Sequence, residues 1–222
     1  MPYPVDLLAG SLAAELALQW QPGIDIGTAG VLTANVKSTL KDVAGYYNDI
    51  FFSGLNGELD ASVNSVNEFA VETPPLQLTA KEIEIGVPLS NVALAFRFDP
   101  LTRQLLVSNF YTEAFGGTLT ASNIKYSFTQ ERNNMKLIFS GLQLERILDL
   151  VKYEWVEAFG AVSGELPMTL TTNGVEMESG TLYADEPGGS IRYLDGAKAG
   201  IQGNPGLDLV NQALGNYQFQ SL

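Results

Sequence analysis

The amino-acid sequence predicts a mainly β protein, an antiparallel meander whose strands carry one apolar and one polar face. Three observations support this class. Apolar and polar residues alternate with a period of two in segment after segment. Short clusters of turn-forming residues separate these segments. The 222 residues include 22 glycines and 9 tyrosines, and the hydrophobic fraction of 45% is typical of an ordered chain.

The alternation begins at residues 11–20 and recurs along most of the chain, which predicts roughly ten or more short strands. In each strand the apolar positions fall on one face, because successive side chains of a β-strand point to opposite sides. The candidate residues of the apolar face are Leu12, Leu16, Leu18, Trp20, Leu32, Val36, Leu59, Val63, Val92, Leu94, Phe96, Phe98, Ile124, Tyr126, Phe128, Met135, Leu137, Phe139, Leu166, Met168 and Leu170.

Turn-forming residues separate the expected strands. Glycine and asparagine tolerate positive φ, and proline presets a turn, so most connections should be hairpins. The predicted turns are Gln21-Pro22-Gly23, Asn56-Gly57, Asp99-Pro100, Asn133-Asn134 and Asn173-Gly174.

Two or three short helices should interrupt the strands. In residues 144–151 the apolar side chains recur at positions i, i+3, i+4 and i+7, which is the stripe of an amphipathic helix. Residues 40–47 repeat that spacing after Ser38, a suitable N-cap. Residues 207–214 do so after Asn204-Pro205, a cap followed by proline at the first helical position. These helices are expected to cover apolar sheet.

The charge balance argues against nucleic-acid partners. Twelve Lys and Arg stand against 25 Asp and Glu, for a net charge of −13. Such a chain repels phosphate backbones and anionic membrane surfaces at long range. No run approaches the ~20 apolar residues that a membrane-spanning helix needs.

The sequence does not indicate an enzyme. Cysteine and histidine are both absent, so thiolate nucleophiles, imidazole bases and the usual zinc ligand sets are missing. The carboxylate pairs Glu82/Glu84 and Glu176/Glu178 should lie on polar strand faces. Ser163 has no histidine to activate it. No catalytic residue, metal site or cofactor is therefore predicted.

An apolar sheet face must be covered, and two covers are compatible with this sequence. A second sheet would close a β-sandwich, whereas a lipid chain would occupy an open groove. The residue pattern alone leaves both alternatives open.

Residues 142–193 contain motifs that resemble one protein family. A short amphipathic helix is followed by the strand Ser163-Gly-Glu-Leu-Pro167 and then by Pro187-Gly-Gly-Ser-Ile-Arg-Tyr193. This order resembles the carboxy-terminal region of the YdbH family, which carries the domain label "dicarboxylate transport". Upstream, Phe115-Gly-Gly-Thr-Leu119 is similar more generally to the AsmA and TamB relatives among the bridge-like lipid transfer proteins.

The resemblance implies a fold and a function. Members are long periplasmic proteins anchored in the inner membrane, and they are thought to form an elongated, curved β-groove of the β-taco type. The groove carries phospholipid toward the outer membrane without catalysis. The resemblance therefore favours the one-sided groove over the closed sandwich, with a phospholipid or another acyl-chain ligand as the bound molecule.

The resemblance also implies partners and a domain organisation. A small outer-membrane lipoprotein is expected to add strands to a sheet edge, and a non-enzymatic periplasmic adaptor that recruits it is the alternative function. Residues 1–222 should form one continuous β-rich segment of a longer chain. Such a fragment is expected to be able to associate with itself through its open edges.

Overall fold

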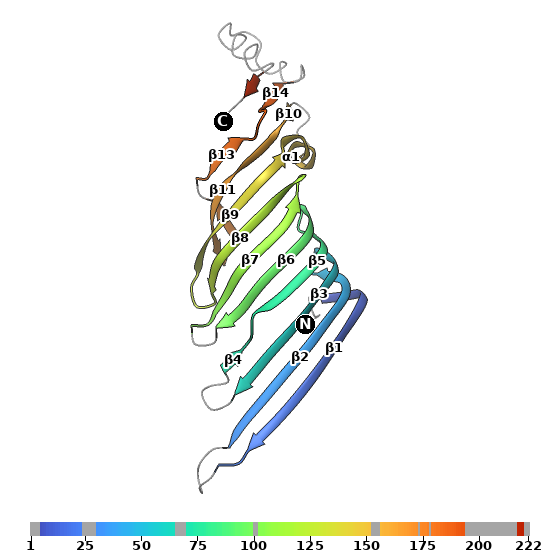
Figure 1. The fold of residues 1–222 in the computed structure, drawn as a ribbon, viewed down its shortest axis with the longest axis vertical. Helices are drawn as coiled ribbons and strands as arrows, with labels where there is room; N and C mark the ends of the chain where they lie inside the picture. The colour runs from blue at the N-terminus through green and yellow to red at the C-terminus, as the bar shows by residue number, and fades with distance from the viewer. Residues whose placement is uncertain are drawn as a thin grey trace. The chain divides into compact units, whose positions relative to one another are not determined.

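The computed structural model describes residues 5–23, 30–64, 70–99, 102–151, 156–172, 174–177, 179–193 and 217–219. Within these ranges β-strands dominate, and one short helix interrupts them (Figure 1). The elements are β1 Val5–Gln21, β2 Val31–Tyr47, β3 Ile50–Asn64, β4 Ala70–Glu72, β5 Leu76–Glu84, β6 Pro88–Asp99, β7 Gln104–Ala114, β8 Gly117–Ser127, β9 Arg132–Gln143, α1 Leu144–Val151, β10 Val156–Phe159, β11 Ala161–Thr171, β12 Gly174–Met177, β13 Thr181–Ala184, β14 Gly189–Tyr193 and β15 Tyr217–Phe219.

Twelve strands belong to one sheet in the order β1-β2-β3-β5-β6-β7-β8-β9-β11-β12, with β4 also paired to β3 and β13 to β11. A second sheet has the order β10-β14-β15. Within the described ranges β1 and β12 lie at opposite ends of this strand order, so the large sheet does not close on itself. The predicted antiparallel meander is confirmed, and a closed sandwich does not form.

The chain divides into two compact units. The first comprises residues 1–112, 120–136 and 168–177, and the second comprises residues 113–119, 137–167 and 178–222. Each unit is described on its own below. Among the described residues, no helix has the length and apolarity needed to span a membrane.

In the first unit, antiparallel pairing keeps one register across residues 11–21, 31–40, 57–64, 76–80 and 92–96. Leu16 lies opposite Val36, and Val36 lies opposite Ala61. Further along the sheet, Gly57 lies opposite Leu78, which lies opposite Leu94. Directly opposed residues of an antiparallel pair point to the same side of the sheet. The apolar positions of β1, β2, β3, β5 and β6 therefore share one face.

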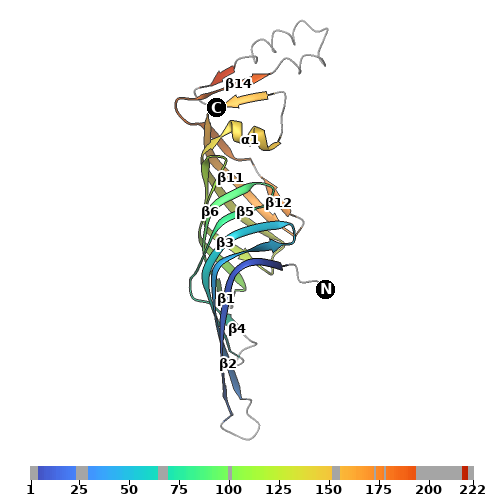
Figure 2. The same ribbon diagram turned by 90° about the vertical axis from the view of Figure 1, so that its right-hand side faces the viewer.

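These long strands bend where a row of residues with positive φ crosses them. The row, here called the bend line, consists of Gly10 (+98°), Asp42 (+49°), Gly54 (+61°) and Asn91 (+52°). The β1–β2 register shifts twice between Leu7 and Ser11, which is the mark of β-bulges. Bulges bend the strand that contains them. Figure 2 shows that β1 and β2 curve strongly near one end.

Polar side chains hold the bend line together. The Asp42 backbone N–H donates to Asn56 Oδ1 at 2.9 Å, and Asn56 Nδ2 donates to the Gly54 carbonyl at 2.8 Å. The Lys81 ammonium lies 3.7 Å from Asp42 Oδ1. Both side chains of that ion pair are mostly exposed, so it adds little stability. The amide of Asn56, which joins two strands, is the more important contact.

One predicted helix is confirmed and one is wrong. The helix at 144–151 is α1 with the predicted bounds. Residues 40–47 instead form the end of β2, where the β2–β3 register shifts on both sides of Val43. Each shift changes the phase of the alternation, so apolar residues on one strand fall three apart and imitate helical spacing. The predicted helix at 207–214 lies outside the described residues.

Two of the predicted turns coincide with strand ends, and two others lie inside strands. β1 ends at Gln21 and β6 ends at Asp99, as predicted. Asn56-Gly57 and Asn133-Asn134 are wrong as turns, because they lie inside β3 and β9. The side chains of Asn56 and Asn133 nevertheless form hydrogen bonds at a bend and beside a turn. Asn133 Oδ1 accepts a hydrogen bond from the Ser127 N–H at 2.7 Å beside the β8–β9 turn. Asn173 lies outside the described residues.

The bend line gives a test of the fold. A Cβ at Gly10 would lie 2.5 Å from Val43 Cα, whereas a Cβ at Gly86, where φ is +88°, would have no neighbour within 4 Å. Both substitutions by alanine incur the cost of positive φ, about 1 kcal/mol. Gly10→Ala adds a backbone clash, so we expect it to lower the free energy of unfolding by about 1–3 kcal/mol more than Gly86→Ala. Urea denaturation measures both, and equal losses would contradict the close approach at Gly10.

Candidate functional site

The cross-strand register gathers the candidate residues of β1 to β6 on one side of the first unit. This surface is called the apolar face below. It is made by Leu12, Leu16, Leu18, Trp20, Leu32, Val36, Leu59, Val63, Leu76, Leu78, Val92, Leu94, Phe96 and Phe98. No charged side chain interrupts this set, because the acidic and basic residues of residues 11–21 and 31–41 occupy the alternate positions.

Much of the apolar face is open to solvent. Leu12, Leu16, Leu18 and Trp20 of β1 are 58–64% exposed, although their side chains are large and apolar. On the inner strand β6, which has neighbours on both sides, Val92 is only 7% exposed. Leu94, Phe96 and Phe98 are half-buried. A second sheet would bury all of these residues, so the open face is what separates this structure from a sandwich.

Aromatic side chains extend the apolar face beyond β6. The ring centroids of Phe98 and Phe128 lie 6.0 Å apart, and those of Tyr126 and Phe128 lie 5.1 Å apart, both with edge-on geometry. Ile124 and Met135 line one hollow of about 350 Å³. The structure thus brings together candidates from β6, β8 and β9 that are far apart in the sequence.

The remaining candidates are divided between the units. Met168 and Leu170 belong to the first unit and lie opposite Met177 and Val175 of β12. Leu137, Phe139 and Leu166 belong to the second unit. There a Cβ at Gly164 would lie 2.8 Å from Phe139 Cζ, so the ring packs against bare backbone. A lipid-lining role for any of these residues stays a prediction.

Leu76, Leu78 and Ala80 are not among the candidates predicted from the sequence. They lie on the same face as Leu94, opposite Phe96, Leu94 and Val92. Leu76 and Ala80 are buried, so they contribute little to the solvent-accessible part of the apolar face. Their alternation in the sequence could have identified them.

One hollow of the first unit is lined by residues from both sets of alternating positions. It has a volume of about 800 Å³ and is lined by Glu15, Leu16, Ala17, Asn35, Val36, Lys37, Asp60, Ala61, Ser62, Thr73 and Pro74. Leu16 and Val36 belong to the apolar face, whereas Glu15, Lys37, Asp60 and Ser62 occupy the alternate positions. The lining of this hollow is therefore mixed, with apolar and charged residues together.

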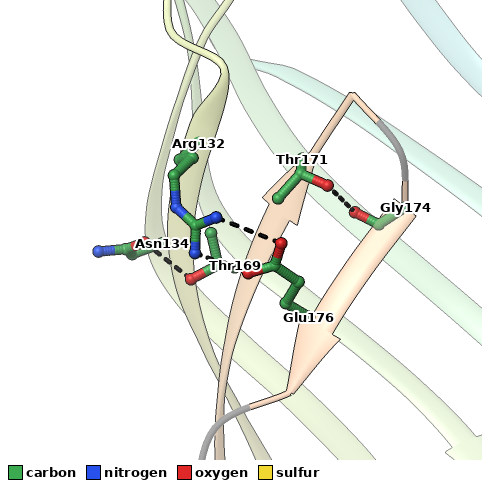
Figure 3. Close-up of polar contacts among 6 residues, drawn as sticks. All are labelled: Arg132, Asn134, Thr169, Thr171, Gly174 and Glu176. Atoms are coloured by element: carbon green, nitrogen blue, oxygen red, sulfur yellow. Dashed lines mark hydrogen bonds and ion pairs between the residues drawn. The ribbon is translucent and has the colours of Figure 1, made fainter.

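Two of the groups considered for catalysis, Ser163 and Glu176, have structural partners. Ser163 is buried, where its Oγ accepts from the Gly141 N–H at 3.0 Å and donates to Asp185 Oδ2 at 2.9 Å. Arg132 holds Glu176 through two hydrogen bonds of 2.7 and 3.2 Å, beside the Thr169–Asn134 contact (Figure 3). No group of three or more Asp and Glu in the described ranges is arranged to hold a metal ion.

Comparison with known proteins assigns the family. A family model described as "YdbH-like: Intermembrane phospholipid transport protein YdbH" matches residues 3–222, well beyond the motifs at 142–193. No curated protein and no solved structure matches the chain. The match covers almost the whole sequence and agrees with the long antiparallel strands described above. The chain therefore belongs to the YdbH-like family of intermembrane phospholipid transport proteins.

Proposed function

We propose that the apolar face of the first unit holds phospholipid acyl chains and forms one segment of a lipid conduit between the inner and outer membranes. One observation carries this proposal: away from the bend line, the cross-strand register aligns the apolar residues of five strands on one face, and that face is open to solvent at β1. Soluble proteins rarely leave an apolar surface of this kind without a partner.

An acyl chain is a suitable partner for chemical reasons. It needs no hydrogen bond, and the apolar face offers leucine, valine and aromatic side chains along its whole extent. Each methylene removed from water contributes about 0.8 kcal/mol. Contact with a few methylenes at a time would therefore hold a chain while allowing it to move on. No reacting group is required, which agrees with a transport role without catalysis.

The polar side of the sheet and the charge of the chain fit the same role. Glu15, Lys37 and Asp60 lie on the side away from the apolar face, and Glu15 and Lys37 are exposed. The net charge of −13 disfavours lateral adsorption to anionic membranes. The periplasm is the compartment that this role requires, and anchoring of the full-length protein in the inner membrane stays a prediction.

A periplasmic adaptor is the second candidate function. In the second unit, β13 pairs with β11, and Leu182 and Tyr183 on β13 are about half exposed. An exposed sheet edge can accept a strand from another protein, and the expected partner is a small outer-membrane lipoprotein. Under this reading the partner would bind, whereas acyl chains would not.

Charged substitutions on the apolar face test the first proposal. We expect Leu16→Asp and Phe96→Asp each to weaken binding of a fluorescent phospholipid by at least about tenfold, because a carboxylate is costly to desolvate beside an acyl chain. Ala17→Asp and Ala95→Asp add the same charge to the other side of the same strands and should leave binding unchanged. Titration of lipid fluorescence gives the dissociation constants, and circular dichroism checks folding. Equal effects of all four changes would exclude the apolar face as the site.

Trp20 provides an independent probe of the same face. The sequence contains a second tryptophan, Trp155, so the measurement uses Trp155→Phe to isolate Trp20. We expect phospholipids brominated on their acyl chains to quench Trp20 emission strongly, because its exposed indole lies on the apolar face. Headgroup-brominated lipid is the control. Quenching by the headgroup label alone would place the acyl chains elsewhere.

A further inference from the structure

The basic residues of the chain are concentrated in its middle part. Residues 97–136, from the end of β6 into β9, contain five Lys and Arg against three Asp and Glu, a net charge of +2. Residues 1–96 contain three against eleven, a net charge of −8, and residues 137–222 contain four against eleven, a net charge of −7. An anionic group therefore meets the least long-range repulsion beside β6 to β9.

The apolar face ends in an aromatic cluster on these same strands. Phe128 directly follows β8, and its ring contacts the rings of Phe98 and Tyr126. The Phe128 side chain is 61% exposed, so the apolar face meets water at this cluster. The phosphate of a bound phospholipid is too costly to desolvate among apolar side chains. It must therefore lie where the strands end, at this end of the sheet or at the opposite one.

Arg103 lies directly beside the aromatic cluster. The Phe128 backbone N–H donates to the Arg103 carbonyl at 3.2 Å, which extends the pairing of β7 and β8 by one residue pair. Opposed Cα atoms of such a pair are about 5.5 Å apart, less than the length of an arginine side chain. Arg103 is exposed, and its guanidinium makes no hydrogen bond or ion pair with another described residue. A cation is thus available where the apolar face ends.

The opposite end of the same strands is acidic. Residues 45–52 connect β2 to β3, and residues 82–90 connect β5 to β6 (Figure 1). These two segments contain no Lys or Arg and three acidic residues, Asp49, Glu82 and Glu84. Lys81, next to the second segment, already forms an ion pair with Asp42. The charges therefore favour a phosphate at the Arg103 end and disfavour one at the other end.

We propose that Arg103 binds the phosphate of a phospholipid whose acyl chains lie on the apolar face, so that the headgroup lies at the ends of β6 and β8. This inference rests on the proposed function and adds an orientation and a headgroup contact to it. A guanidinium presents its donors in a planar fork that matches two phosphate oxygens, and it stays charged at every ordinary pH. Because all phospholipids contain the phosphate, the contact orients a lipid without selecting one headgroup.

Removal of the Arg103 charge tests the contact. The two probes are a phosphatidylethanolamine and a diacylglycerol with the same fluorescent acyl chain, so they differ only in the headgroup. We expect Arg103→Gln to weaken phospholipid binding about threefold to tenfold and to leave diacylglycerol binding unchanged, because only the phospholipid carries a phosphate. Arg103→Lys keeps the charge and should restore part of the loss. Fluorescence titration at low salt, where charges are least screened, gives the dissociation constants.

Arg97→Gln is the matched control for net charge. Arg97 is exposed and alternates with Phe96 and Phe98 along β6, so it lies on the polar side of the sheet. We expect its replacement to leave the binding of both probes unchanged. Glycerophosphoethanolamine, which is the headgroup without acyl chains, should displace neither probe when it is added at the concentration of the lipid. Circular dichroism checks the folding of each variant.

A quencher on the headgroup tests the orientation independently. In a chain that carries Trp20→Phe and Trp155→Phe, the change Phe128→Trp places an indole beside Arg103. Phe51→Trp places an indole at the opposite end of the sheet, where β3 begins. We expect a phospholipid with a nitroxide on its headgroup to quench the indole introduced by Phe128→Trp more strongly than the one introduced by Phe51→Trp.

Four results would overturn the headgroup contact. Equal losses with Arg103→Gln and Arg97→Gln would show that only net charge matters, and equal losses for both probes would show a structural role. Stronger quenching after Phe51→Trp would reverse the orientation, and displacement by glycerophosphoethanolamine would show a site for soluble phosphates. If the unaltered protein binds neither probe, the proposed function itself fails. If it binds both and Arg103→Gln weakens neither, only the headgroup contact fails.

Discussion

Antiparallel pairing that keeps its register away from the bend line, from β1 across the sheet to β6, is the constraint on which the rest of the first unit depends. Because side chains alternate along a strand, a slip of one residue in any pair would move an entire apolar row to the polar side. Leu16 opposite Val36, and Leu78 opposite Leu94, show that the rows remain aligned across the sheet. A single apolar surface exists only because this alignment persists.

The bend line reconciles long strands with a curved sheet. An L-residue with positive φ costs about 1–2 kcal/mol, yet Asp42 and Asn91 adopt it as well as Gly10 and Gly54. Asp and Asn tolerate this conformation better than other side chains. The Asn56 amide offsets part of the cost at Asp42 through its two hydrogen bonds. The bend is thus a property of particular residues and their polar partners.

The sequence allowed the strand alternation, α1 and most apolar-face residues to be predicted, because each depends on a local period of two or nearly four. The helix expected at 40–47 was wrong because two register shifts beside Val43 imitate helical spacing. Exposure was not predictable either: Leu18 and Val92 have the same alternation, yet only Val92 has neighbouring strands on both sides. Tertiary neighbours, which no local pattern encodes, decide which apolar residues remain open.

The bend line also bears on how such a sheet can grow. β1, β2, β3 and β6 each contribute a residue with positive φ, so curvature is encoded in several strands and not by a single central element. An inserted or duplicated hairpin would preserve both the curvature and the two chemically distinct sides if it kept the alternation and one such residue per strand. The architecture is therefore modular, and its length can change during evolution without redesign of the strands already present.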